Sequence, residues 1–375
     1  MNKFLINATN LHVGGGVQVA TSFIEELLLI KKKETLKNIS IFLSNEVNKS
    51  FFSTNKKSKI FLEYKIENSY GFSVVPNKLT RRFNFYNTVF TIFGPLYCWN
   101  KSFKSIVGFA QPWIIYPENE CYKILSLVER IKTRLKYKIQ GLFFKRADII
   151  IVEIESVKKK LISILGIQPN RIHVIHSCVS SVYFDKSYWK SINIPHHKGY
   201  LRLGYLGRNY LHKNTSIFIE VAKKLINLYG IKVFFYVTFT KQEWANCTSE
   251  FKNVCINVGP LQPAQCPRFY KAMNGMIFPS LLECFSVMPL ESMIMKKPLF
   301  VSDRIFNRET CGSHAHYFDP LSPASAAKII STVFNERTPK LKELRLARKH
   351  AIKFSNAKDR AKKYLTLLTS DTKIL

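Results

Sequence analysis

Short apolar runs alternate along the chain with stretches of helical periodicity. Phe4-Leu5-Ile6 is followed by three glycines, Gly14 to Gly16, and then by apolar residues at helical spacing from Val17 to Leu28. This order predicts a strand, a glycine loop and a helix. Further apolar runs at 39–43, 105–109, 149–152 and 172–175 alternate with helical stretches. Such a rhythm is typical of βαβ units that form a parallel sheet.

A second series of the same kind begins at Leu201. Apolar runs at 201–206, 232–239, 254–258, 275–279 and 298–302 are predicted strands, and residues 215–229 and the chain from Ala324 onward are predicted helices. Residues 187–199 show no periodicity and are interpreted as a linker. We therefore expect an α/β protein with two Rossmann-like, doubly wound domains at 1–186 and 200–355. We expect the C-terminal helix, 356–375, to cross back to the first domain.

The composition is strongly basic, with 57 Lys and Arg residues against 25 Asp and Glu residues and a formal net charge of +32. With 46% hydrophobic residues, the chain is too apolar for an intrinsically disordered protein. Spread positive charge attracts polyanions, which leaves nucleic acid, anionic lipid and phosphorylated substrates open as partners. A general bias toward Lys, Ile, Asn and Phe is an alternative source of part of the charge.

The eight cysteines are scattered, without a pair at zinc-ligand spacing and without the pattern of a disulfide framework. The N-terminal apolar stretch is too short for a signal peptide, and no run reaches the roughly 18 apolar residues that span a bilayer. No histidine has a second ligand at a fixed spacing, so none is assigned to chemistry. We expect no metal site and a cytoplasmic location.

The densest group of chemically capable residues lies between Pro279 and Met293. Glu283 is predicted in a strand-to-helix turn, and Glu291 eight residues later in the following helix. A helical rise over that interval is roughly 12 Å, which suits two carboxylates that hold two ends of one elongated ligand. The N–H groups at the start of the helix favour phosphate. The alternative is that both glutamates only stabilise the helix dipole.

Two other motifs are weak when each is taken alone. Gly207 and Arg208 follow the predicted strand at 201–206, and Lys213 comes five residues later, so two cations leave the carboxyl end of a strand, where open parallel sheets bind ligands. They could neutralise a diphosphate or simply be solvated. Gly14 to Gly16 fits neither the G-x-G-x-x-G fingerprint nor a P-loop. These glycines could bring the backbone close to a phosphate or sugar, or serve packing.

Taken together, these motifs resemble the retaining family-four glycosyltransferases of the GT-B fold. The E-x7-E spacing of Glu283 and Glu291, followed by the stretch from Lys297 to Asp303, carries the resemblance. It extends over nearly the whole chain, because Gly15 to Gln18 matches the family's glycine loop and Arg208 with Lys213 matches its basic pair.

The resemblance implies two facing domains with a nucleotide-sugar donor in the cleft between them. The implied donor-binding residues are Gly15, Gly16, Arg208, Lys213, Phe285, Ser286, Val287 and Glu291, and the implied catalytic residues are Glu283, Arg208 and Lys213. The cations and the helix N-terminus after Phe285 would hold the diphosphate. Glu291 would hold the ribose hydroxyls, and Glu283 would contact the transferred sugar. The family transfers sugars without a metal, with retention, by front-side displacement.

The sequence departs from the family pattern at two places. Cys284 and Ser286 flank Phe285 where glycines are common in the family, so their side chains narrow the predicted sugar pocket. Ala110 stands where many relatives carry a histidine that touches the donor sugar. Gln111 or Trp113 could contact the sugar instead, and a packed core aromatic is the alternative for Trp113.

The segment from Tyr122 to Arg146 combines apolar residues at helical spacing with many cations, and Arg81 to Tyr86 adds an aromatic and basic patch. Both could contact an anionic membrane surface, or the helix could be a core helix with a solvated basic face. We expect a hexosyltransferase peripheral to the inner face of the cytoplasmic membrane. Its expected substrates are a UDP- or GDP-sugar and a lipid-linked or cell-surface polysaccharide acceptor, such as lipopolysaccharide O-antigen.

Two alternatives to this function stay open. A GT-B sugar-nucleotide epimerase would share the fold, although the E-x7-E spacing disfavours it. A basic nucleic-acid-binding protein would explain the charge, but the sequence lacks the motifs of RNA readers and of helix-turn-helix proteins.

Overall fold

A computed structural model of the chain describes residues 2–29, 36–51, 60–71, 78–336, 341–354 and 356–370. Their contacts form two compact units. Unit 1 draws on Met1–Pro117, Leu125–Cys178 and Ser355–Leu375, and unit 2 draws on Glu118–Ile124 and Val179–Phe354. The sequence-based domain boundaries stay predictions, and residues 371–375 of the predicted C-terminal helix lie outside the described residues.

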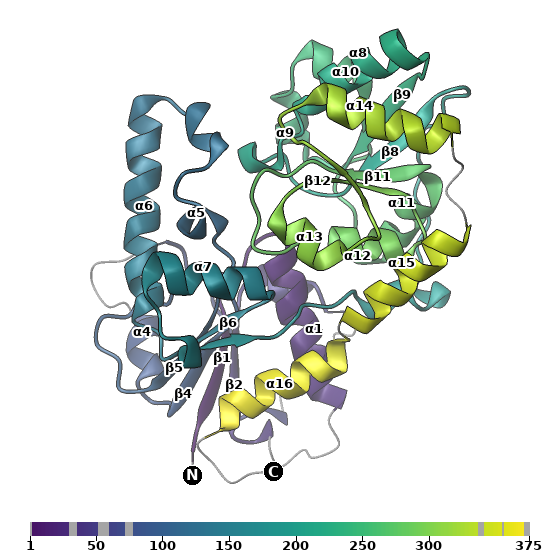
Figure 1. Cartoon of the computed structure of the whole chain (residues 1–375). Coiled ribbons are helices and arrows are strands. Elements are labelled where there is room, and N and C mark those ends of the chain that lie inside the picture. Colours follow the sequence, from purple (N-terminus) through teal and green to yellow (C-terminus); the bar gives the residue numbers. More distant parts are fainter. Residues whose placement is uncertain are drawn as a thin grey trace. The chain divides into compact units, whose positions relative to one another are not determined.

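Within the described residues, unit 1 is built on a seven-stranded parallel sheet of order β3-β2-β1-β4-β5-β6-β7 (Figure 1). Its strands are β1 (Phe4–Ala8), β2 (Ile39–Leu43), β3 (Glu63–Ile66), β4 (Thr88–Thr91), β5 (Lys104–Gly108), β6 (Ile149–Val152) and β7 (Ile172–Val174). Its helices are α1 (Gly15–Leu29), α3 (Asn45–Lys49), α4 (Lys78–Phe83), α5 (Pro112–Ile115), α6 (Leu127–Lys145), α7 (Glu155–Leu165) and α16 (Ala357–Thr369). The central strands β1 and β2 are buried along their whole length, as parallel strands covered on both faces must be.

The described residues of unit 2 form a six-stranded parallel sheet of order β10-β9-β8-β11-β12-β13. Its strands are β8 (Leu201–Tyr205), β9 (Val233–Val237), β10 (Cys255–Asn257), β11 (Gly275–Phe278), β12 (Leu299–Ser302) and β13 (His316–Phe318). Its helices are α8 (Ile217–Tyr229), α9 (Lys241–Ala245), α10 (Ser249–Val254), α11 (Cys266–Ala272), α12 (Met288–Ile294), α13 (Ile305–Cys311), α14 (Pro323–Ser331) and α15 (Leu341–Phe354). The two doubly wound parallel sheets expected from the sequence are therefore confirmed.

Three strands do not stand out in the hydrophobic pattern. β3 is an edge strand of mixed charge with three half-buried residues and one exposed residue, Ile66, and β13 is an edge strand of three residues. β4 is fully buried, but its four residues include Thr88 and Thr91, which interrupt the apolar run. In each case the strand is set by its pairing with a neighbour more than by its own pattern.

The predicted linker lies against unit 2. Between Trp189 and Tyr200 the structure, which describes this whole segment, has no helix or strand. The Lys190 amide donates a hydrogen bond to the Ala264 carbonyl at 2.9 Å, and the Tyr236 hydroxyl donates one to the Pro195 carbonyl at 2.7 Å.

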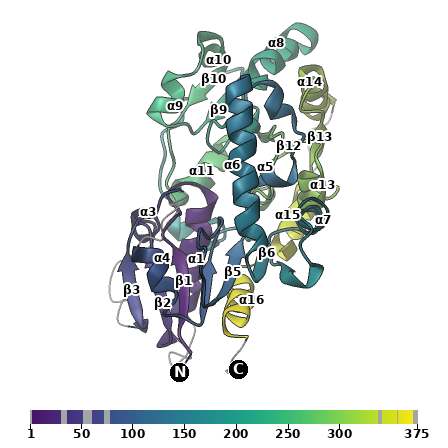
Figure 2. The ribbon, with the colours of Figure 1, turned by 90° about the vertical axis from the view of Figure 1, so that its left-hand side faces the viewer.

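The basic segment predicted at 122–146 forms α6, the 19-residue helix seen in Figure 2 with the short helix α5 beside it. It begins at Leu127, later than expected, because Ser126 and Glu129 form a capping box there. Glu120–Lys123 is a separate 3₁₀ turn, and its residues belong to unit 2. In the described part of the chain, no helix combines the length and apolar character needed to cross a membrane.

The C-terminal helix α16 completes the core of unit 1, where it lies against α1 (Figure 1). Tyr364 packs edge-on against Phe23 and Phe90, with ring centroids 5.1 Å apart in both pairs. On the same helix, Arg360 is only 2% exposed. Its guanidinium donates hydrogen bonds to the hydroxyls of Ser22 at 2.9 Å and Ser177 at 3.3 Å. Apolar packing and a buried cation thus hold α16 in place.

We expect Arg360→Ala to lower the melting temperature of unit 1 by roughly 5 °C. Losing a buried, hydrogen-bonded side chain costs on the order of 2 kcal/mol, which corresponds to such a shift in a domain of this size. Lys362→Ala is the matched control, because Lys362 lies exposed on the same helix. Calorimetry of the three proteins measures the effect, and equal melting of the two variants would show that Arg360 does not anchor α16.

Candidate active site

The predicted site residues of unit 2 lie at the switch point of its sheet, where the order in which the strands are added reverses. β8 is paired with β9 on one side and with β11 on the other, so the strands that follow β8 first build toward one edge of the sheet, to β10, and then from β11 toward the other edge. The loop after β8 carries Arg208 and Lys213, and the loop after β11 carries Glu283. The carboxyl ends of parallel strands flanking such a point are the usual place for a ligand in doubly wound folds.

Gly207 is required by the tight turn after β8. A Cβ atom at this position would lie 2.8 Å from the Tyr205 hydroxyl, closer than side chains approach. That hydroxyl donates a hydrogen bond to the Arg208 carbonyl at 3.1 Å, and the Gly207 amide donates one to Thr238 Oγ1 at 3.1 Å. The turn therefore holds the backbone at Arg208 against two neighbouring strands.

Arg208 is positioned by Glu243, a residue that the sequence motifs do not single out. Its Nε donates a hydrogen bond to Glu243 Oε1 at 2.8 Å, and the Asn209 amide donates to the same oxygen at 3.1 Å. The other carboxylate oxygen accepts the Thr240 amide at 2.8 Å in the capping box of α9. Burial alone would raise the pKa of Glu243, but the hydrogen bonds from Arg208 and Thr240 outweigh it and lower this pKa.

The terminal nitrogens of the Arg208 guanidinium make no hydrogen bond to any residue that the structure describes. The side chain is about one-third exposed. The two terminal NH2 groups of a fixed, always charged fork are thus available to an anionic ligand.

Lys213 and Glu283 form a largely buried ion pair between Lys213 Nζ and Glu283 Oε1. The same two loops are joined by the backbone, because the Leu281 amide donates to the His212 carbonyl at 2.8 Å. Asn214, in the left-handed conformation with φ 55°, ends the 3₁₀ turn η6 (Leu211–Lys213). Its side-chain amide nitrogen, Nδ2, donates a hydrogen bond to the Pro320 carbonyl at 2.8 Å. The structure thus brings together one predicted cation and the first predicted carboxylate.

His212, next to this pair, is neutral at physiological pH. Burial lowers the pKa of its imidazole to about 4, although Glu283 acts in the opposite direction. A group with that pKa is a poor proton donor near pH 7.

Glu291 is buried in the first turn of α12. Its Oε2 accepts a hydrogen bond from the Tyr270 hydroxyl at 2.7 Å, and Tyr183 also donates to this carboxyl group. Burial raises the pKa of Glu291 to about 7, even though both tyrosine hydrogen bonds act to lower it. The two carboxylates of the E-x7-E spacing therefore have different partners, a lysine for Glu283 and two tyrosines for Glu291.

Residues 285–287 form the non-helical approach to α12 and are half-buried. The helix begins only at Met288, so the helical rise assumed between Glu283 and Glu291 does not describe this stretch. The Phe285 ring stacks on Phe354 at the end of α15, with centroids 5.9 Å apart. The role of Phe285, Ser286 and Val287 in holding a diphosphate stays a prediction.

The glycine loop lies in unit 1, at the carboxyl end of β1. Gly14 adopts φ 73°, and a Cβ atom on Gly15 would meet no other atom within 4 Å. A Cβ on Gly16 would lie 3.2 Å from the Leu11 side chain, so Gly16 serves close packing. Gly14 and Gly15 both leave open space where a Cβ atom would lie, but only Gly15 does so without a positive φ.

The first-domain candidates after β5 are Gln111 and Trp113. Gln111 precedes α5 and makes no side-chain capping bond, while Trp113 stacks on Tyr137 of α6 with ring centroids 5.7 Å apart. The stacking favours the packing role for Trp113. A contact of Gln111 with sugar stays a prediction.

Comparison with solved structures decides the fold. Anabaena HepE in complex with UDP and glucose matches 99% of this chain and all of its own, with TM-score 0.66 and 13% identity. A glycosyltransferase from Rickettsia africae matches over the full length of both chains, with TM-score 0.64 and 16% identity. WaaG, a glycosyltransferase involved in lipopolysaccharide biosynthesis, matches 97% of this chain and 99% of its own, with TM-score 0.67 and 10% identity.

The chain has the GT-B fold. No protein-family model matches the sequence, and no curated protein is similar to it. The GT-B architecture expected from the sequence is confirmed, while membership of the retaining family four stays a prediction.

Sequence reasoning on this GT-B chain misses the residues that hold the predicted groups in place. Glu243 orients Arg208, and Tyr183 with Tyr270 hold Glu291. The spacing of Thr240 and Glu243 is a capping signal that could have located Glu243 at a helix start. The two tyrosines lie 108 and 21 residues before Glu291, so no local signal connects them to it.

We expect the stability advantage of the wild-type protein over Glu291→Gln to fall as pH rises from about 4.5 to about 7. The unfolded carboxyl group loses its proton near 4.5 and the folded one near 7. In that window the native state binds more protons than the unfolded state, so stability falls with pH, by at most about 1 kcal/mol per pH unit.

Denaturant melts of both proteins from pH 4 to 8.5 measure this difference, with Glu250→Gln as the control because Glu250 is exposed. Above about pH 8, where the carboxyl group is ionised in both the folded and the unfolded state, the difference is expected to be flat. A difference that stays constant across the window, or that grows with pH, would contradict the raised pKa.

Proposed function

We propose that the chain is a glycosyltransferase that moves a hexose-type sugar from a nucleotide-diphosphate sugar to an acceptor. The observation that carries the proposal is the pairing of Lys213 with Glu283 beside Arg208 at the switch point of the second sheet. The solved structures of similar fold support it, since HepE is seen with UDP and with UDP-glucose. A UDP-sugar is the first donor to test, and a GDP-sugar is the second.

The arrangement suggests how a donor would be held. Arg208 keeps its two terminal NH2 groups for phosphate oxygens while Glu243 fixes its orientation. A diphosphate that draws Lys213 toward itself would free Glu283 to accept hydrogen bonds from sugar hydroxyls. Prepositioned cations stabilise the charge that develops on the departing diphosphate, which is the largest contribution expected for this chemistry.

The proposed reaction retains the anomeric configuration and needs no metal. The bond between the anomeric carbon and the diphosphate oxygen breaks while the acceptor oxygen bonds to the same face of that carbon. The acceptor proton moves to the departing phosphate oxygen. Glu283 then acts by charge and position and forms no covalent bond to the sugar.

A sugar-nucleotide epimerase of the same fold is the alternative enzyme. It needs acid and base groups directed at the donor sugar, but Glu283 is paired with Lys213, and His212 has a pKa of about 4. Both features favour transfer over epimerisation.

The acceptor is proposed to be a lipid-linked or cell-surface glycan, and α6 is proposed to hold the protein at an anionic membrane. Leu127, Ile131 and Leu135 follow one another at four-residue spacing and are 70%, 59% and 57% exposed. None of the residues from Lys123 to Lys138 is buried. The cations of this stretch are Lys123, Arg130, Lys132, Arg134, Lys136 and Lys138. An apolar stripe bordered by cations suits the interface of an anionic bilayer.

For the donor site, we expect Lys213→Gln and Arg208→Gln to lower kcat by roughly 10²- to 10³-fold, because each removes a charge that stabilises the leaving group. Glu291→Ala should mainly weaken donor binding. Lys241→Gln, an exposed cation of unit 2, is the matched control. A thermal-shift screen of UDP-, GDP- and dTDP-sugars identifies the donor, and steady-state kinetics follow. Unchanged kinetics in all three site variants would refute the assignment.

For α6, we expect salt-sensitive flotation with vesicles containing phosphatidylglycerol and little with phosphatidylcholine alone. The double variant Lys132→Gln/Lys138→Gln should bind roughly 10- to 30-fold more weakly, since each basic residue near the surface contributes about 1 kcal/mol. Lys358→Gln/Lys363→Gln on α16 is the control of equal charge. Binding that ignores salt, or no binding at low salt, would contradict an electrostatic attachment.

A further inference from the structure

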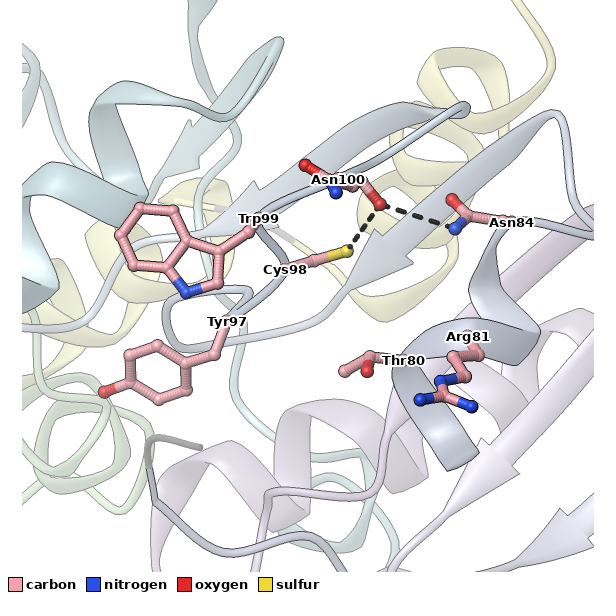
Figure 3. A pocket seen from close by; sticks show the side chains of 7 residues that line it. All are labelled: Thr80, Arg81, Asn84, Tyr97, Cys98, Trp99 and Asn100. Carbon is pink, nitrogen blue, oxygen red and sulfur yellow. Dashed lines mark hydrogen bonds between the residues drawn. The ribbon is translucent and has the colours of Figure 1, made fainter. Parts of the chain in front are cut away.

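Unit 1 contains a pocket that the proposed function does not use. It has a volume of about 170 Å³ and is lined by Thr80, Arg81, Asn84, Tyr97, Cys98, Trp99 and Asn100 (Figure 3). A second hollow adjoins it, shares Asn84, Trp99 and Asn100, and adds Lys101, Ser102 and Arg146. We call the two hollows together the Trp99 pocket.

The Trp99 pocket lies at the amino ends of the unit 1 strands, whereas the glycine loop lies at their carboxyl ends. Asn84 shortly precedes β4 and Asn100 shortly precedes β5, so both stand at the amino ends of parallel strands. Gly15 follows β1 and stands at the carboxyl ends. The pocket is therefore separate from the glycine loop.

Hydrogen bonds and ring contacts hold the walls of the Trp99 pocket. Asn84 Oδ1 accepts the Ser102 amide at 3.0 Å and the Ser102 hydroxyl at 3.1 Å. The Cys98 thiol donates to the Asn100 carbonyl at 3.4 Å, and burial raises the pKa of this thiol, which keeps it neutral. The Trp99 ring meets Phe143 of α6 edge-on, with centroids 4.8 Å apart. These contacts hold the pocket in shape without a ligand.

Several groups of the Trp99 pocket are available to a ligand. The indole of Trp99 is 44% exposed. The Arg81 guanidinium makes no hydrogen bond or ion pair to any described residue, and the side-chain amide of Asn100 makes no hydrogen bond to one. The indole offers an apolar face, and the Asn100 amide offers both a hydrogen-bond donor and an acceptor. The Arg81 guanidinium offers a charged fork.

The charge around the Trp99 pocket is positive after the local ion pairs are taken into account. Arg82 is paired with Glu63, and Lys101 is paired with Asp148. Arg81 has no carboxylate partner among the described residues. Arg146 lies over the Trp99 ring, 5.5 Å from its centroid, and donates to the Trp99 carbonyl at 2.5 Å. It has no ion pair with a carboxylate in the described part of the chain. Two guanidinium groups therefore favour an anion here.

We propose that the Trp99 pocket binds a polyol phosphate. The phosphate would bind Arg81 and Arg146, and the hydroxylated carbon skeleton would lie on the Trp99 indole and hydrogen-bond to the Asn100 amide. Such a ligand could be a free sugar phosphate or the headgroup of a membrane lipid. This site is additional to the donor site of the proposed function and does not depend on it.

Calorimetric titration with glucose 6-phosphate, glucose and inorganic phosphate tests the proposal. Glucose 6-phosphate should bind more tightly than either of the others, because it engages both halves of the pocket. Arg81→Gln and Trp99→Leu should each weaken it about tenfold, the loss expected for one charge-assisted or stacking contact. Lys159→Gln, another exposed cation of unit 1, is the matched control. Circular dichroism melts verify that the variants fold.

Vesicles of equal charge separate the two sources of ligand. Phosphatidylglycerol presents a polyol phosphate, while phosphatidylserine does not. Weaker binding of Arg81→Gln to phosphatidylglycerol vesicles only, relative to Lys159→Gln, would identify a lipid headgroup. Weaker binding to glucose 6-phosphate with unchanged vesicle binding would identify a free sugar phosphate.

The proposal is overturned if Arg81→Gln and Lys159→Gln behave alike toward glucose 6-phosphate and toward both kinds of vesicle. It is also overturned if Arg81→Gln weakens binding to both lipids equally, since that reports net charge alone. Thermal shifts by nucleotide sugars should be unchanged in Arg81→Gln, so a failure of this site is distinguishable from a failure of the donor site.

Discussion

The ion pair between Lys213 and Glu283 joins the two loops that leave the middle of the second sheet. A carboxylate removed from water must be given a partner, and the cost of leaving it unpaired is several kcal/mol. Each buried or half-buried carboxyl group of this region has a different kind of partner. Glu283 has a lysine, Glu243 has an arginine and a capping threonine, and Glu291 has two tyrosines. The shape of the candidate site follows from these pairings.

The same pairings change the meaning of the net charge of +32. At the switch point, Arg208 and Lys213 are balanced by Glu243 and Glu283, so the local charge of these four groups is formally zero. An anionic donor would therefore find fixed, directional N–H groups more than a general positive field. Among the described residues, guanidinium groups without a carboxylate partner are found elsewhere, at Arg81 and Arg146.

Periodicity was sufficient to predict both sheets, because buried parallel strands are continuous apolar runs that alternate with amphipathic helices. It failed for β3 and β13, whose edge positions tolerate polar residues, and for β4, where two threonines are buried in the sheet. For the site, the motifs indicated Arg208, Lys213, Glu283 and Glu291. They could not indicate Glu243 or the tyrosines, because a partner for a buried group is selected by three-dimensional proximity and leaves no spacing in the sequence.

The place of α16 has a consequence for how the protein is made. This helix packs Tyr364 and Leu368 into the core that also contains β1 and α1, yet it follows the whole of unit 2 in the chain. At typical translation rates, the ribosome needs roughly 10–40 s to pass from the end of β7 to the start of α16. During that interval, unit 1 has emerged with an apolar face of its core uncovered, while unit 2 can fold to completion. The half of the molecule that is synthesised first is thus closed last, and chaperones would meet it with that face exposed.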